Sequence, residues 1–271
     1  MDFICPICRG SLTTAADKTK KCPKGHSFDR ARAGYYNLLP PRGGGCHGDN
    51  REMTEARRAF LSGGYYAPLA TRVAEIVRDL TPALGTVLDA GAGEGYYTAM
   101  CESALFDRDG DSSFLAFDIS KDAMRYAAKA APRVSFAVAS SYDMPLADGS
   151  VDTVVNLFSP LAPDEVRRVL RTGGHFVFVF PDAEHLFGLK ARIYDTPYKN
   201  EPQKTDLEGF TCLSDESLSY TLKLETPEAV RSLFMMTPYA YRTSKVGRER
   251  ILALDCLECE AAFRILVYKR A

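Results

Sequence analysis

The chain has 271 residues, 46% of them hydrophobic and 25% charged, with a formal net charge of −1. This length suits one large domain and one small domain, and the composition is ordinary for a globular protein. The near-zero charge excludes a polyanion binder that works through overall charge, although a local basic patch would suffice for RNA. There is no apolar run of ~20 residues and no secretory signal, so we expect a cytoplasmic protein without a membrane partner.

The first 40 residues carry two short metal-binding patterns. Cys5-Pro-Ile-Cys8 and Cys22-Pro-Lys-Gly-His26 form a C-x2-C pair and a C-x3-H pair, thirteen residues apart. Four such ligands fill the shell of Zn²⁺, and so short a segment needs a metal to fold, so we expect a structural zinc site. The alternative is reduced side chains without metal. Basic residues could form an RNA-binding patch or an ordinary charged surface: Lys18, Lys20, Lys21, Lys24, Arg30 and Arg32.

A Pro/Gly-rich stretch over residues 40–49 predicts a linker. We interpret Cys46 and His47 within it as incidental rather than metal-binding. Helical spacing of apolar residues predicts helices over 52–61 and 68–80. The expected organisation is a zinc-binding domain, a linker with its helix, and a catalytic domain, at residues 1–40, 41–62 and 63–271. Cysteines outside the cluster are expected to be buried thiols: Cys46, Cys101, Cys212, Cys256 and Cys259.

From residue 86 onward, short apolar runs alternate with helical patterns. The strands are expected over residues 86–90, 114–119, 134–139, 151–158 and 175–180. The helices between them are expected over residues 96–105, 122–131 and 163–170. Near-continuous apolar strands are typical of a parallel sheet covered on both faces, so the fold class is α/β with a doubly wound, Rossmann-like sheet. Arg171-Thr-Gly-Gly174 reads as a tight turn into the fifth strand.

A polar stretch over residues 182–217 interrupts the alternation, and inserts of this length are often lids or substrate loops. Beyond it we expect a strand over 218–224, a helix over 226–236 and a strand over 257–269. Thr226, followed by proline, is a fitting residue to cap that helix.

The most informative motif is a strand that runs into the glycine-rich turn Gly91-Ala-Gly-Glu-Gly95. Glycines let the backbone approach a ligand closely. Asp118 ends the next strand, where a carboxylate can bind both hydroxyls of a ribose. The turn resembles the first motif of the class I methyltransferases, which implies S-adenosylmethionine as cofactor. Asp89 and Glu94 could order the turn or contact the amino-acid portion of this cofactor.

Two polar segments follow later strands, at the rim where ligands bind in open α/β sheets. Ser140-Ser-Tyr-Asp143 follows the third strand, near the expected adenine edge, and Asn156 ends the fourth. Asp143 could instead cap a turn, and Asn156 could be an ordinary turn residue.

These residues together resemble the bacterial 23S ribosomal RNA (guanine-N1)-methyltransferases. The resemblance covers the two zinc patterns, Gly34-Tyr-Tyr-Asn-Leu-Leu-Pro40, Ala56-Arg-Arg-Ala-Phe-Leu61, Tyr66-Ala-Pro-Leu69, Gly93-Glu-Gly-Tyr-Tyr-Thr98 and Leu207-Glu-Gly-Phe-Thr211. It implies zinc at Cys5, Cys8, Cys22 and His26, and cofactor contacts from Tyr66, Gly93, Glu94 and His185. Without it, Tyr66 reads as helix packing and His185 as a surface residue. Residues 43–47 depart from the family's pattern.

The implied substrate is a guanine in a hairpin loop of 23S ribosomal RNA, where unstacked bases are cheaper to extrude. The proton on guanine N1 must leave, and its acceptor stays open among Asp143, an Asn156 that orients the base, and water. Arg42, Arg57 and Arg58 are hypothetical phosphate contacts, and the resemblance favours a homodimer. Two alternatives remain: a methyltransferase for a small, quinone-precursor-like molecule, and a non-catalytic zinc-dependent RNA-binding module.

Overall fold

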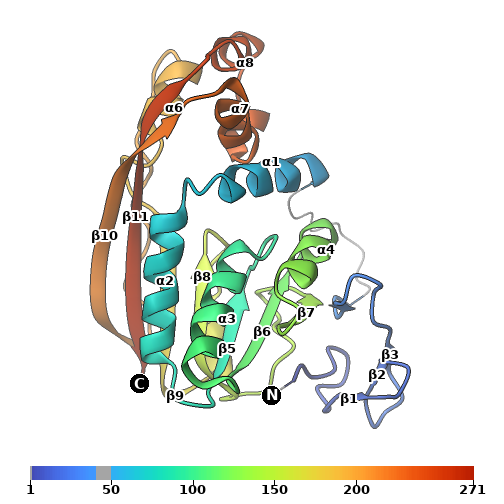
Figure 1. Ribbon diagram of the computed structural model, residues 1–271. Helices are drawn as coiled ribbons and strands as arrows, with labels where there is room; N and C mark the ends of the chain where they lie inside the picture. Colours follow the sequence, from blue (N-terminus) through green and yellow to red (C-terminus); the bar gives the residue numbers. More distant parts are fainter. Residues whose placement is uncertain (1, 41–49) are drawn as a thin grey trace.

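The computed structural model describes residues 2–40 and 50–271. The N-terminal zinc module, residues 2–40, contains a small antiparallel sheet of three two-residue strands. These are β1 Thr13–Thr14, β2 Lys20–Lys21 and β3 Ser27–Phe28. It lies beside the β7 side of the main body (Figure 1). Its last strand, β4 Tyr36–Asn37, pairs in parallel with β7 and so becomes an edge strand of the central sheet. The module is therefore joined to the main sheet by backbone hydrogen bonds.

The central sheet has eight strands in the order β10-β11-β9-β8-β5-β6-β7-β4. Its middle is parallel, whereas β11 runs antiparallel to both β9 and β10. The strands other than β4 are β5 Thr86–Ala90, β6 Ser113–Asp118, β7 Ser135–Val138, β8 Val151–Leu157, β9 Leu170–Pro181, β10 Phe210–Leu224 and β11 Leu257–Arg270. The expected α/β class and the positions of the five parallel strands are confirmed.

Two apolar cores cover the two faces of this sheet. Successive side chains of β5 alternate between them, with Val87 in one core and Leu88 in the other, as the two-residue period of a strand requires. Helices α2 Ala67–Leu80, α3 Tyr96–Asp109 and α4 Lys121–Ala130 contribute to the first core. The second core combines α5 Pro163–Val169 with residues of the zinc module. The zinc module thus supplies part of the cover that one sheet face needs.

A cap lies beyond one end of the sheet and consists of α1 Arg51–Ser62, α6 Phe187–Ile193, α7 Pro227–Met235, the 3-10 turn Pro238–Tyr241, α8 Lys245–Leu252 and the adjoining ends of β10 and β11. Figure 1 shows α1 lying between the other cap helices and the helices of the main body. Asn50 caps α1 by accepting a hydrogen bond from the backbone N–H of Met53 at 2.9 Å. Thr226 caps α7 by accepting from Ala229, as expected.

The segment after β9 differs most from the sequence-based expectation. The polar stretch 182–217 contains helix α6 and the first half of β10, so the strand expected over 218–224 begins eight residues earlier. The expected turn 171–174 lies inside β9. Helix α8 was not expected. Polar outward-facing residues on an edge strand weaken the apolar alternation from which strands are recognised. This explains why the sequence predicted only the second half of β10.

The four described thiols outside the zinc cluster divide into two groups. Cys101 and Cys259 are buried as expected, but Cys212 and Cys256 are exposed, and for these two the expectation was wrong. Cys212 lies near the start of the edge strand β10, and Cys256 lies in the turn between α8 and β11. Among the described residues, no helix has both the length and the apolar character needed to cross a membrane.

Candidate functional site

The four predicted zinc ligands lie together. The side-chain ligand atoms of Cys5, Cys8, Cys22 and His26 are all within 4.8 Å of one another. His26 Nδ1 lies 3.5 Å from Cys5 Sγ and 3.3 Å from Cys22 Sγ, and the sulfurs of Cys8 and Cys22 are 3.6 Å apart. Bond lengths of about 2.3 Å to sulfur and 2.0 Å to nitrogen give tetrahedron edges of about 3.5–3.8 Å. The donor set therefore fits Zn²⁺ with no position left open for catalysis.

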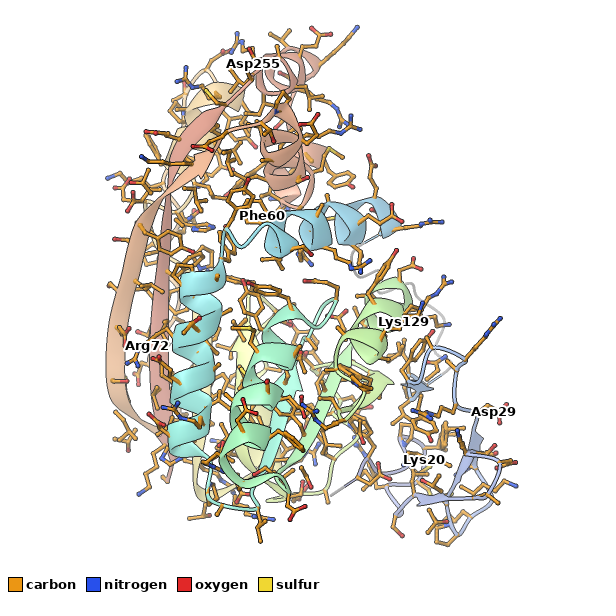
Figure 2. The ribbon with its side chains drawn as sticks, in the orientation of Figure 1. Lys20, Asp29, Phe60, Arg72, Lys129 and Asp255 are labelled. Carbon is orange, nitrogen blue, oxygen red and sulfur yellow. The ribbon has the colours of Figure 1, made fainter. Side chains whose placement is uncertain are left out.

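Each pair of zinc ligands sits on a tight backbone turn. The N–H of Cys5 donates to the carbonyl of Gly10 at 2.8 Å, and the N–H of Cys22 donates to the carbonyl of His26 at 3.0 Å. Not every basic residue of the module faces solvent. Lys20, labelled in Figure 2, is 4% exposed, and its ammonium is paired with Asp2 and lies over the Tyr36 ring. Lys20 is thus part of the module's structure.

The glycine turn joins β5 to α3 through left-handed backbone. Gly91, Gly93 and Gly95 have φ values of 102°, 56° and 88°. A Cβ at Gly91 would come within 2.1 Å of Ser159 Oγ, and a Cβ at Gly95 within 2.8 Å of the Ala127 Cα in α4. The glycines at 91 and 95 are needed for both conformation and space, whereas a Cβ at Gly93 would meet only Arg57 Nη1, at 4.0 Å. The turn is held close to β8 and α4.

Asp118 links the glycine turn to the end of β6. Its carboxylate accepts hydrogen bonds from the N–H of Gly93 at 3.0 Å and from the N–H of Ser120 at 2.8 Å. The carboxylate therefore orders the turn, and its role toward a ribose stays a prediction.

Two buried oxygens at the ends of β5 and β8 lack hydrogen-bond partners among the described residues. One carboxylate oxygen of Asp89 accepts from Thr98 at 2.6 Å, and the other, Oδ1, has no partner. Burial raises the pKa of Asp89 to about 7. Asn156 donates its amide N–H to the carbonyl of Ala90 at 3.0 Å, and its Oδ1 is likewise unsatisfied. Buried oxygens of this kind are costly unless a ligand supplies donors, so they fit a site for the cofactor's ammonium and neighbouring groups.

Glu94 and Tyr97 complete this end of the sheet. Glu94 is 6% exposed, and its charge adds to the raised pKa of Asp89 after the larger effect of burial. The Tyr97 hydroxyl is a third buried polar atom without a partner in the described part of the chain. Its ring packs on Phe158, the residue that follows β8 with a φ of 55°. The sequence analysis did not single out Tyr97, although its place at the start of α3, directly after the glycine turn, was a usable signal.

Tyr66 and His185 meet in a buried aromatic group. The Tyr66 hydroxyl lies 3.2 Å from His185 Nε2, and His185 Nδ1 accepts the backbone N–H of Ala262 at 3.2 Å. Nδ1 is thus unprotonated, so Nε2–H donates to Tyr66. Burial, with Lys190 as a second cause, lowers the pKa of His185 to about 3. His185 is 7% exposed, so the surface position expected without the family resemblance was wrong.

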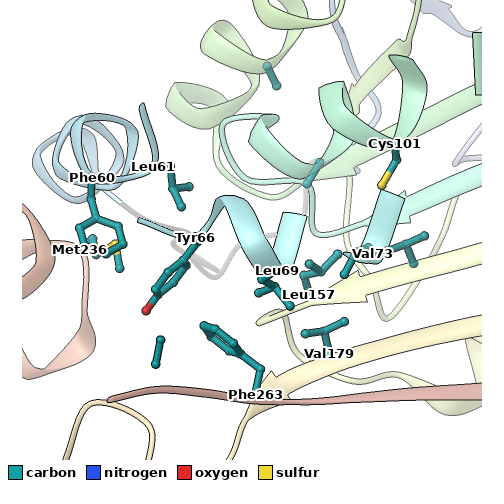
Figure 3. Packing of buried hydrophobic residues seen from close by; sticks show 14 of the residues in the cluster. Phe60, Leu61, Tyr66, Leu69, Val73, Cys101, Leu157, Val179, Met236 and Phe263 are labelled. Atoms are coloured by element: carbon teal, nitrogen blue, oxygen red, sulfur yellow. The ribbon is translucent and has the colours of Figure 1, made fainter. Parts of the chain in front are cut away.

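The surroundings of Tyr66 belong to the apolar core shown in Figure 3. Its ring packs edge-on against Phe60 of α1 and Phe263 of β11, at centroid distances of 4.9 and 5.0 Å. Burial raises the pKa of Tyr66. The packing role that the sequence alone predicted for Tyr66 is therefore confirmed. The hydroxyl that meets His185 is the polar part from which a cofactor contact could come.

Asp143 lies in the turn after β7, where it forms an ion pair with Arg9 of the zinc module. Arg57 lies 4.0 Å from the position that a Cβ on Gly93 would occupy and donates to the carbonyl of Met236 at 3.4 Å. Arg58 is exposed and its guanidinium lies 4.9 Å from the Tyr126 ring centre. The structure thus separates the two arginines, with Arg57 beside the turn and Arg58 on the surface. Arg42, Cys46 and His47 lie outside the described residues.

The sheet order, the glycine turn and the unsatisfied oxygens define a class I, S-adenosylmethionine-dependent methyltransferase with an N-terminal zinc ribbon. A family model described as "RlmA, N-terminal" matches residues 3–42, and one described as "Methyltransferase domain" matches residues 87–174. The chain is 42% identical over 185 residues to a 23S rRNA (guanine(748)-N(1))-methyltransferase of Streptomyces fradiae, which covers 67% of this chain and 64% of that protein.

Two further relatives carry names for the same kind of reaction. The chain is 42% identical over 207 residues to a protein of Micromonospora griseorubida, an alignment that covers 70% of this chain and 68% of that protein. It is 32% identical over 256 residues to the YxjB protein of Bacillus subtilis strain 168, covering 90% and 88% respectively. Each of the two names begins "Putative 23S rRNA (guanine-N(1)-)-methyltransferase". The chain belongs to the family of 23S ribosomal RNA (guanine-N1)-methyltransferases.

A pair of glycine substitutions separates space from conformation in the turn. Gly95→Ala and Gly110→Ala both place a Cβ in left-handed backbone, at a cost of about 1–2 kcal/mol. Only Gly95→Ala brings that Cβ against the α4 backbone, whereas the control position has open space. We expect Gly95→Ala to lower the free energy of unfolding by about 2 kcal/mol more than Gly110→Ala. Equal losses in urea denaturation would contradict the close approach.

Loss of a zinc ligand gives a second prediction. Cys22→Ser is expected to abolish zinc binding and to lower the melting temperature of the module, because structural zinc contributes directly to folding. Cys256→Ser removes an exposed thiol and should leave both properties unchanged. Atomic absorption measures the zinc content of each variant, and circular dichroism measures its melting temperature. Full zinc occupancy in Cys22→Ser would rule out this ligand set.

Proposed function

We propose that the protein transfers a methyl group from S-adenosylmethionine to N1 of a guanine in a hairpin loop of 23S ribosomal RNA. The observation that supports this most is the zinc ribbon joined to the methyltransferase domain, with the ligand atoms of its four residues clustered. A substrate in the ribosome also supports a cytoplasmic location. The family resemblance supports a homodimer.

The cofactor supplies an electrophilic methyl group, and the protein has to orient it and exclude water. The proposed cofactor contacts are the turn with Gly91, Gly93, Glu94 and Gly95, together with Asp89, Asp118, Tyr66 and His185. An ammonium near Asp89 would lower the pKa of that carboxyl from about 7, because it favours the charged form. The neutral His185 and the Tyr66 hydroxyl then present polar atoms without adding charge.

The guanine must lose its N1 proton as the methyl group arrives, while the sulfur keeps the electron pair of the broken bond. Of the two candidate residues, Asn156 has a free amide oxygen at the end of β8, and it is the better one for orienting the base edge. Asp143 already forms an ion pair with Arg9, so its carboxylate is engaged in the contact with the zinc module. We therefore favour orientation by Asn156 and proton transfer to water.

The two arginines of α1 are proposed to meet different anions. Arg58 is exposed and suits RNA phosphate, as expected from the sequence. Arg57 was expected to do the same, but its place beside Gly93 favours the carboxylate of the cofactor's methionine portion. Arg42 remains a candidate phosphate contact from the sequence alone.

Reverse transcription tests the proposed reaction directly. Unmodified 23S ribosomal RNA is incubated with the protein and S-adenosylmethionine, and primer extension is then read for new stops. Methyl on N1 blocks the pairing edge, so we expect one cofactor-dependent stop at a guanine of a hairpin loop. Bound S-adenosylhomocysteine without any stop would contradict the proposal and favour a small-molecule substrate. RNA binding without turnover on any substrate would favour a non-catalytic module.

The salt dependence of RNA affinity tests the assignment of the arginines. Arg58→Ala should weaken RNA binding and reduce the slope of log Kd against log salt by about 1, because one phosphate contact is lost. Arg57→Ala should leave that slope unchanged and weaken S-adenosylhomocysteine binding about tenfold. Filter binding over a salt series and calorimetry measure the two effects. The reverse pattern, with the slope reduced only by Arg57→Ala, would restore the expectation from the sequence for Arg57.

A further inference from the structure

The first zinc knuckle, residues 5–10, contacts the loop that follows β7. We define this loop as residues 140–146. The N–H of Ile4, next to the knuckle, donates to the carbonyl of Pro145 at 2.9 Å. The guanidinium of Arg9 donates to the carbonyl of Met144 at 3.0 Å and forms an ion pair with Asp143. Backbone and side chain of the knuckle region thus reach three consecutive residues of the loop.

The knuckle itself fixes the direction of Arg9. The N–H of Arg9 donates to the carbonyl of Cys5 at 2.8 Å, and Arg9 has a φ of 59°. Left-handed backbone is unfavourable for a residue with a Cβ and persists only where its surroundings determine it. Here the surroundings are a turn closed by Cys5 and Cys8, two of the four zinc ligands. A bound metal would therefore hold the residue that reaches the loop.

The opposite side of the loop is held by α5. Glu165 accepts the N–H of Met144 at 2.7 Å, and Arg168 donates to the carbonyls of Met144 and Leu146 at 2.9 and 2.7 Å. Met144 and Leu146 are fully buried in the same core as Phe3 and Cys5 of the zinc module. The loop is therefore clamped between α5 and the module, and removal of one support leaves its backbone held from one side only.

We propose that the zinc knuckle, acting through Arg9, positions the loop 140–146 for the adenine of the cofactor. This inference rests on the proposed function, because the loop follows β7 at the edge where the adenine is expected. In this proposal Arg9 is a positioning residue that acts through the loop. One task of the zinc module is then to keep the cofactor site in its binding form. Its position beside β7 can be followed in Figure 1.

Calorimetry with two adenine ligands tests this role. S-adenosylhomocysteine and 5′-methylthioadenosine are titrated into the full-length zinc-loaded protein, into Arg9→Ala and into Arg32→Ala. The control removes an exposed arginine from the same module. We expect Arg9→Ala to weaken both ligands by about the same factor, near tenfold, because both carry the adenine. Arg9→Lys keeps the charge but not the forked geometry and should give an intermediate loss. Arg32→Ala should bind both ligands like the parent protein.

Three controls keep the outcomes distinct. Zinc content and melting temperature are measured for every variant, and the parent protein is also titrated after its zinc is removed with a chelator. The stripped protein should lose at least as much affinity as Arg9→Ala. If Arg9→Ala does not fold, the stripped protein decides the question. Unchanged affinity in either sample, or a loss confined to RNA binding, overturns the inference. A parent protein that binds neither ligand would instead count against the proposed function.

Discussion

The candidate site depends on one backbone constraint, the left-handed turn between β5 and α3. Positive φ at Gly91, Gly93 and Gly95 lets the chain leave a buried strand and enter a helix within five residues. Space at the first and last of these positions is so limited that a side chain would meet Ser159 or the α4 backbone. The turn therefore fixes the spacing of β5, β8 and α4 at the rim where ligands of parallel sheets bind.

Unsatisfied polar atoms explain where chemistry can occur in this fold. Most buried polar groups have partners, as the hydrogen bond from Thr98 to Asp89 and the one from Asn156 to Ala90 illustrate. The remaining oxygens of Asp89 and Asn156 stay without partners in the described residues, at the ends of neighbouring strands. Their desolvation is a cost that a bound ligand with donors would offset. The raised pKa of Asp89 has the same origin.

The zinc module is more closely integrated than its small size suggests. Its β4 extends the central sheet, its apolar residues enter the core of one sheet face, and its knuckle contacts the loop after β7. The cap is likewise joined to the main body, since Phe60 of α1 packs on Tyr66, and Tyr66 contacts His185 from the segment after β9. Segments far apart in the chain thus converge on one end of the sheet.

The sequence by itself determined the zinc ligands, the alternating strands and the glycine turn, because each depends on local spacing and on residue chemistry. Cys5, Cys8, Cys22 and His26 are paired by short turns, and β5 matches its expected bounds because all five of its residues are buried. Only the tertiary structure decided that Arg9 reaches Asp143, that Tyr66 meets His185, and that Arg57 and Arg58 face different surroundings. These contacts join residues that are distant in the chain or differ only in the direction of a side chain, and no local pattern encodes either relation.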